Sequence, residues 1–327
     1  MALVVMRFDM RRPAISPVSA ADLYRTSLEM STWADQNGLA SVVLSEHHGV
    51  DDGYLSSPMV MAGALAGATK NIMINIAAIL TPLYDPLRLA EDIAVLDLVS
   101  GGRLSLVLGL GYRPSEYEMF GKEWKGRGKA FDEMLGVMKQ AWTGEPFEYQ
   151  GRTVQVTPKP LSSPHPLIFI GGSSPNAAKR AAKHGMSFFP ALGDPALQQT
   201  YMDECARLGT SPGMVLLPSG PGFVHVAEDP DKAWAEIGEY ILYETMVYAS
   251  WQLPGQTSHV HSHATTVDEL RAEGNYLIVT PEEAVKVAND LGPMGSLVLH
   301  PLIGGMPADM AWSSLELIGS KVMPHLT

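Results

Sequence analysis

The chain has 327 residues, with 23 Lys and Arg against 35 Asp and Glu, which gives a formal net charge of −12. No long run carries one sign of charge, so nucleic acid and anionic membranes are disfavoured as partners. The single cysteine, Cys205, excludes an internal disulfide framework and fits a reducing cytoplasm. One α/β barrel can accommodate this length, which therefore does not require two domains.

The N-terminus predicts a strand rather than an export signal. In MALVVMRFDMRR the apolar residues precede the basic ones, the reverse of a secretory signal. The longest apolar stretch, residues 72–80, is far shorter than the roughly twenty residues that a membrane span needs. We therefore expect a soluble, cytoplasmic protein with no membrane partner.

Short β-branched runs alternate along the chain with longer helical patterns, which is typical of βα units around a parallel sheet. The predicted strands cover residues 3–8, 41–45, 72–80, 104–108, 167–170, 186–191, 215–226 with a break at LPSGPG (217–222), and 297–300. The predicted helices cover residues 20–37, 57–69, 87–98, 129–142, 177–184, 234–248 and 308–323. Residues 144–166 have a hairpin-like pattern with no helical period. This alternation predicts an α/β fold, a closed (β/α)₈ TIM barrel in a single domain over residues 1–327.

The segment after residue 248 is polar and rich in Gly, His and Thr. Long loops inside a compact domain are usually functional, so we expect residues 250–276 to form a lid insertion at the barrel mouth. His259, His261 and His263 alternate within this segment, a spacing that could present three imidazoles to a metal ion. No carboxylate or cysteine stands at ligand spacing, so a polar loop with no metal is favoured and any role of these histidines stays open.

Polar residues follow several of the predicted strands. Active sites of such barrels lie at the carboxyl ends of the strands, so these residues should share one mouth. Glu46, His47 and His48 follow the strand at residues 41–45. The glycines of residues 109–111 and the GGSS of residues 171–174 follow two further strands.

The turn GGSSPN leads from a strand directly into a helix. Gly171 and Gly172 allow the backbone to approach a ligand closely. Ser173, Ser174 and Asn176 then place hydroxyl and amide groups at a helix N-terminus, where free N–H groups and partial positive charge suit a phosphate. Ordinary helix capping explains the same residues without a ligand, so both interpretations stay open.

Several segments occur together, in one order, over most of the chain. They are SEHHG, IAAIL with TPLYDPLRLAEDIAVLDLVSGGRL, GLGYRPSEYEMFG, RGKAFDEM, PLIFIGGSSPNAAKRAAKHG, VAEDPDKAW and TPEEA. This ordered set resembles the bacterial luciferase-like monooxygenase superfamily. The resemblance implies a (β/α)₈ barrel that binds reduced FMN, or the deazaflavin F420, at its C-terminal mouth.

The resemblance also implies roles for the residues after the second strand. His47 takes the place of the family's strand-two histidine, which serves in catalysis as a proton donor or stabiliser. An imidazole is suited to that task because such groups titrate near neutral pH. Glu46 and His48 are expected to orient the mouth and, with Tyr112, to form its substrate side.

For the cofactor, Ala77 and Ala78 match a position where the family often has a non-proline cis peptide under the flavin ring. Gly109 matches a reactive cysteine of luciferase, which argues against light emission on the luciferase pattern. Leu110 stands where luciferase has an arginine, so the cation that meets the phosphate stays open between Arg113 and Lys129. The implied cofactor-binding set is Ala77, Ala78, Gly109, Lys129, Gly171, Gly172, Ser173, Ser174 and Asn176.

The resulting hypothesis is a flavin-dependent monooxygenase in which reduced FMN, supplied by a separate flavin reductase, and O₂ oxidise a small organic substrate. An F420-dependent oxidoreductase that transfers a hydride is one alternative. A non-catalytic flavin-binding barrel subunit is the other. Segments equivalent to residues 88–92 often lie at dimer interfaces in the family, so a homodimer is expected.

Overall fold

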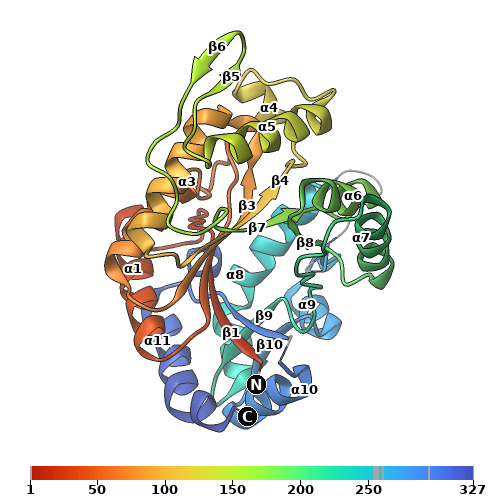
Figure 1. Ribbon diagram of the computed structural model, residues 1–327. Coiled ribbons are helices and arrows are strands. Elements are labelled where there is room, and N and C mark those ends of the chain that lie inside the picture. The colour runs from red at the N-terminus through yellow and green to blue at the C-terminus, as the bar shows by residue number, and fades with distance from the viewer. Residues whose placement is uncertain (1, 253–257, 260, 294, 327) are drawn as a thin grey trace. The chain divides into compact units, whose positions relative to one another are not determined.

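The computed structural model describes residues 2–252, 258–259, 261–293 and 295–326 (Figure 1). The chain divides into two compact units. The first unit comprises residues 1–43, 50–55 and 218–327, and the second unit comprises residues 44–49 and 56–217. A single domain over the whole chain stays a prediction. Part of the predicted lid, residues 253–257 and 260, lies outside the described residues.

The first unit is built on parallel strands. β1 (Leu3–Phe8) pairs in parallel with β11 (Ser296–Leu299), and β9 (Phe223–Val226) pairs in parallel with β10 (Tyr276–Val279). β2 covers Ser41–Leu44, its last residue belonging to the second unit. The helices of the first unit are α1 (Ala20–Gln36), α8 (Pro230–Ser250), α9 (Val267–Glu273), α10 (Pro281–Leu291) and α11 (Ala308–Leu317), with short helical turns at Ile303–Gly305, Ile318–Val322 and Met323–His325.

α1 illustrates how the sequence specifies these elements. The Ser19 hydroxyl caps the helix by accepting a hydrogen bond from the Asp22 N–H at 3.1 Å. Leu23, Met30 and Ala34 are buried and recur at helical spacing. The helix therefore buries the face that the sequence predicts.

The second unit contains four parallel strands in the order β3 (Met73–Leu80), β4 (Leu104–Gly109), β7 (Leu167–Gly171) and β8 (Ser187–Phe189). Every residue of β4 is buried, as expected for an apolar strand covered on both faces. β5 (Phe147–Tyr149) and β6 (Arg152–Val154) form an antiparallel hairpin that projects past α5 in Figure 1. The helices are α2 (Pro58–Ala68), α3 (Pro86–Ser100), α4 (Pro114–Met119), α5 (Arg127–Ala141), α6 (Pro175–His184) and α7 (Pro195–Leu208), with a short turn at Thr81–Leu83.

The predicted strand at residues 215–226 is broken at LPSGPG, residues 217–222, as expected. Before the break Val215 makes only an isolated bridge to Phe188, and the strand proper is β9, after the break. Pro218 and Pro221 interrupt the run because proline has no N–H to donate to a ladder. β10 and the helices α4, α7, α9 and α10 add to the predicted elements.

Both units have the parallel strands and intervening helices of the predicted α/β class. Closure of all strands into one (β/α)₈ barrel stays a prediction. Within the part of the chain that the structure describes, we find no helix with both the length and the apolar content that a membrane span requires.

Candidate functional site

The polar side chains that follow β2, those of Glu46, His47 and His48, are buried. Glu46 is buried, and its carboxylate accepts hydrogen bonds from the Leu80 N–H at 2.7 Å and the Tyr84 hydroxyl at 2.6 Å. His48 Nε2 lies 2.9 Å from Glu46 Oε1. These contacts tie the chain after β2 to the end of β3, and they favour an orienting role for Glu46 over a direct contact with substrate.

His47 is held by a carboxylate from α4. Its Nδ1 lies 2.8 Å from Glu116 Oε1, and the same oxygen accepts the His48 N–H at 3.0 Å. Arg113 Nη1 donates to this oxygen at 3.2 Å. Burial alone would raise the pKa of Glu116, but His47, the His48 N–H and Arg113 together lower it below its ordinary value. Glu116 is therefore an ionised, buried acceptor.

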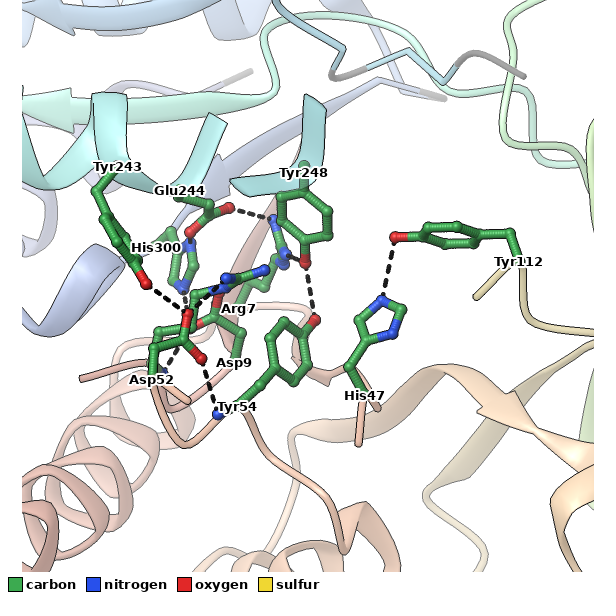
Figure 2. A network of polar contacts seen from close by, with 11 residues as sticks. Arg7, Asp9, His47, Asp52, Tyr54, Tyr112, Tyr243, Glu244, Tyr248 and His300 are labelled. Atoms are coloured by element: carbon green, nitrogen blue, oxygen red, sulfur yellow. Dashed lines mark hydrogen bonds and ion pairs between the residues drawn. The ribbon is translucent and has the colours of Figure 1, made fainter. Parts of the chain in front are cut away.

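The ionised carboxylate determines which nitrogen of His47 carries the proton. Glu116 can only accept a hydrogen bond, so Nδ1 of His47 is the donor. Nε2 then faces the Tyr112 hydroxyl, 3.2 Å away, as Figure 2 shows. The two rings meet nearly edge to face, with centroids 5.3 Å apart at 75°. The result is a relay in which the proton on Nδ1 is fixed and Nε2 can accept or release one.

Small residues pack closely at the ends of β3, β4 and β7. The peptide bond between Ala77 and Ala78 is cis, as the family resemblance implies. A Cβ added at Gly109 would lie 3.2 Å from the Ala78 Cβ, and one added at Gly171 would lie 2.8 Å from Val107 Cγ1. A side chain at Gly171 would therefore displace Val107, and one at Gly109 would need a shift of a few tenths of an ångström, whether or not a ligand approaches them.

The turn after β7 shows the capping that the sequence allows. Ser174 is the N-cap of α6, and its hydroxyl accepts the Ala177 N–H at 3.3 Å. Gly172 has φ +135°, a backbone conformation that disfavours larger residues. Ser173 and Asn176 make no side-chain hydrogen bond with the residues described, so their polar groups are available at the helix N-terminus.

The candidate cations for a phosphate differ in their exposure and in their partners. Lys129 is 86% exposed and lies 3.7 Å from Glu133, while Arg113 is engaged by Glu116. Arg127, which the sequence did not single out, stacks on the Trp124 ring with its guanidinium carbon 3.5 Å from the centroid. Its Nε is buried without a hydrogen-bond partner among the described residues. A buried unpaired donor makes Arg127 the better candidate.

One site residue, Glu116, went beyond the sequence prediction, and the alternating histidines have contacts of their own. Glu116 lies on α4, a helix that the sequence did not predict, and only its burial distinguishes it from Glu118 on the same helix. The alternating histidines form no ligand cluster within the described ranges: His259 Nε2 lies 2.7 Å from the Gly220 carbonyl, and the rings of His261 and His263 pack against one another at 4.3 Å.

The sequence belongs to the luciferase-like monooxygenase family, whose profile matches residues 6–288. Among curated relatives, the oxygenase component of a flavin-dependent trigonelline monooxygenase from Acinetobacter baylyi is 28% identical over 50% of this chain and 47% of its own. An FMNH₂-dependent dimethylsulfone monooxygenase from Pseudomonas putida is 26% identical over 62% of this chain and 57% of its own. The alignments span about half the length of these relatives.

Solved structures share the fold over nearly the whole chain. A monooxygenase from Streptomyces bottropensis has a TM-score of 0.79 at 24% identity, covering 99% of both chains. The oxygenating constituent of a Pseudomonas putida diketocamphane monooxygenase, solved with FMN, has a TM-score of 0.75 at 21% identity, covering 100% of this chain and 99% of that one. An F420-dependent secondary alcohol dehydrogenase has a TM-score of 0.70 at 17% identity and covers 100% of both.

Replacing Glu116 by Ala should lower the free energy of unfolding by about 2–3 kcal/mol, because the His47 Nδ1–H and the His48 N–H lose their shared buried acceptor. Glu116→Gln should cost less, since an amide oxygen can still accept. Urea unfolding at neutral pH measures both, with Glu118→Ala on the exposed side of α4 as the matched control.

The Glu116 carboxylate should also make the free energy of unfolding decrease at acid pH. Its pKa is lowered in the folded state, so its contribution is present above the ordinary glutamate pKa of about 4.3 and is lost as pH falls through the lowered value. Glu116→Gln should lack this loss. Equal stability of Glu116→Ala and Glu118→Ala would contradict the assignment of Glu116 as a structural acceptor.

Proposed function

We propose that this chain is a flavin-dependent monooxygenase that binds reduced FMN and uses O₂ to oxidise a small organic substrate. The observation that carries the proposal is the relay from the buried Glu116 and His47 to the half-buried Tyr112, in a member of the luciferase-like family. Relatives named for reduced-flavin oxygenation support the cofactor. By analogy with an oxygenase component, a separate flavin reductase would supply it.

The residues at the strand ends of the second unit fit a flavin nucleotide. Ser173 and Asn176 offer polar groups at the N-terminus of α6, where free N–H groups suit a phosphate. The unpaired Nε of Arg127 is the candidate partner for its charge. Ala77 and Ala78 in the second half of β3 and Gly109 at the end of β4 carry at most a methyl group, which suits a flat ring. Bound reduced FMN would supply the electrons that activate O₂.

His47 would move a proton at Nε2. Because Glu116 retains the proton on Nδ1, the neutral imidazole exposes an acceptor at Nε2, and the imidazolium exposes a donor there. The Tyr112 hydroxyl at 3.2 Å positions that nitrogen and can be displaced by a reacting group. Glu46 holds the backbone on which both histidines stand. Substrate contacts from His48 and Tyr112 are part of the same proposal.

An F420-dependent oxidoreductase is the second candidate. The fold it shares with an F420-dependent alcohol dehydrogenase favours it, and a histidine with a fixed tautomer serves proton transfer in hydride chemistry equally well. A non-catalytic subunit is disfavoured, because the relatives named for their activity are oxygenases. The partner of His47 Nε2 is also a phenol that a reacting group can displace.

We also propose that the strands of both units close into one (β/α)₈ barrel and that residues 250–276 act as its lid. The near-complete coverage of the solved relatives supports the barrel. The polar composition of the segment supports the lid.

Titrating the protein anaerobically with reduced FMN and with reduced F420, and then admitting air, tests the cofactor. We expect tighter binding of FMN and consumption of O₂ once air enters. Tighter binding of F420 without O₂ consumption would establish the alternative, and binding of neither cofactor would refute both. Calorimetry and an oxygen electrode provide the two measurements.

Replacing His47 by Ala should lower turnover by about 100- to 10,000-fold, the usual contribution of a general acid or base, while the affinity for cofactor changes little. His325→Ala, at an exposed position near the chain end, is the control and should behave as the wild type. Equal losses of turnover and cofactor affinity would recast His47 as a binding residue.

The expected homodimer has a candidate surface on α2 and α3. Val60, Val95, Leu98 and Val99 are 76%, 46%, 41% and 57% exposed on these two packed helices, a concentration of apolar area typical of an interface. Val99→Glu should give a monomer in sedimentation experiments, because burying a carboxylate in such an interface is costly. Leu161→Glu, an exposed loop position, is the control, and a dimeric Val99→Glu would exclude this surface.

A further inference from the structure

The first unit contains a second group of buried ionisable residues, which the proposed function does not use. Asp9 follows β1 and His300 follows β11, so both stand at the carboxyl ends of paired parallel strands. Glu244 reaches them from α8 (Figure 2). The three residues are 0%, 2% and 1% exposed. Such groups are costly to bury unless their charges are compensated.

The two ring nitrogens of His300 face different carboxylates. Nε2 lies 3.4 Å from Asp9 Oδ1, and Nδ1 lies 3.2 Å from Glu244 Oε2. Both contacts are at ion-pair distance, and neither ring nitrogen has a hydrogen-bond partner among the described residues. A neutral imidazole has only one N–H, so it would leave one nitrogen lone pair facing a carboxylate.

Two arginines hold the outer oxygens of these carboxylates. Arg7 Nη1 donates to Glu244 Oε1 at 3.1 Å, and Arg11 Nε donates to Asp9 Oδ2 at 3.1 Å. Arg11 Nη1 also donates to Asp52 Oδ2 at 2.7 Å. The Arg11 guanidinium, fully buried, packs against the rings of Tyr54, Tyr248 and Trp251.

The remaining titratable groups around the cluster are neutral. Burial raises the pKa of Tyr54, Tyr248 and Tyr276, and it raises the pKa of Tyr243 to about 12. On β9, burial lowers the pKa of His225 to about 4. All of these groups are therefore uncharged at neutral pH.

With all three carboxylates ionised, the charges balance if His300 is protonated. Arg7 and Arg11 supply two positive charges, and Asp9, Asp52 and Glu244 supply three negative charges. A neutral His300 would leave one buried negative charge without a counter-charge, which is strongly destabilising.

We propose that His300 is a buried imidazolium that bridges Asp9 and Glu244, and that its proton clamps the ends of β1 and β11 to α8. The clamp is a pH-sensitive element of the fold, independent of the function proposed for the second unit.

A metal ion is the competing occupant of this cluster, since ligand atoms of Asp9, Glu244 and His300 lie within 4.8 Å of one another. A metal would take one nitrogen of the imidazole, whereas here each nitrogen faces a different carboxylate. The guanidinium groups of Arg7 and Arg11, bonded to the same carboxylates, would also repel it. The geometry therefore points to a proton rather than a metal.

The pKa shifts agree in direction. Burial favours the neutral imidazole, but Glu244 and Asp9 outweigh it and raise the pKa of His300 above its ordinary value. Burial likewise opposes ionisation of Asp9, yet His300, Arg11 and Arg7 hold its pKa well below the usual range. The contribution of His300 to stability is thus present below the ordinary histidine pKa of about 6.5 and is lost as pH rises through the raised value.

Unfolding by urea from about pH 6 to about pH 10, for the wild type and for His300→Gln, tests the clamp. The wild type should be more stable than His300→Gln near pH 6, and this difference should shrink as pH rises. The ratio of the two folding equilibrium constants should fall by up to about tenfold per pH unit. His225→Gln, which removes a neutral buried histidine from the adjacent β9, should keep the pH dependence of the wild type. An advantage that stays constant with pH would overturn the proposal.

A measurement on the unchanged protein keeps the proposal testable if His300→Gln does not fold. NMR of ¹⁵N-labelled histidine should show one of the ten histidines with both ring nitrogens protonated at a pH where unperturbed histidines are neutral. Asp9→Asn should lower the titration midpoint of that histidine. Neutral rings throughout at about pH 8, or a stoichiometric metal whose removal by chelator shifts the His300 signals, would overturn the proposal.

Discussion

The hydrogen bond between the Glu116 carboxylate and His47 Nδ1 is the contact on which the site of the second unit depends. An ionised carboxylate can only accept, so it assigns the proton to one nitrogen and leaves the other for chemistry. The same oxygen accepts the His48 N–H and thereby fixes the backbone after β2 against α4. His47, the His48 N–H and Arg113 together outweigh burial and keep the pKa of the carboxylate low, so it stays charged. One oxygen atom thus sets the tautomer, the ring orientation and the course of the chain.

The number of carboxylates facing an imidazole decides what the imidazole can do. His47 has a carboxylate on one nitrogen and a phenol on the other, a weak partner that a reacting group can replace. His300 has a carboxylate on each nitrogen, and in the proposed arrangement its proton is retained from both sides. The first arrangement suits proton transfer, and the second suits a structural cation.

Much of the fold follows from patterns within single elements. Alternating β-branched and helical periods predicted the parallel strands, and the apolar spacing of α1 matches its buried face. The misses are elements whose signals are short. α7 has Asp194 as cap, Pro195 at its first position and Gly209 after its end, all standard helix signals, but its apolar stripe is thin. β10 is only four residues long, and its first residue, Tyr276, falls in the segment predicted to be a lid.

The residues of the site show the same contrast between what a pattern within one element predicts and what depends on packing between elements. The rule that active sites lie at strand ends made Glu46, His47 and His48 candidates, because it needs only the order of strands and polar residues. Glu116 lies 69 residues away from its partner, on a helix of six residues. Glu116 and Glu118 have the same side chain. A helix of six residues is too short for an apolar repeat to indicate which of the two is buried. Only the packing of α4 against the chain after β2 separates them, and that packing makes one glutamate a fixed acceptor while the other remains a solvated charge.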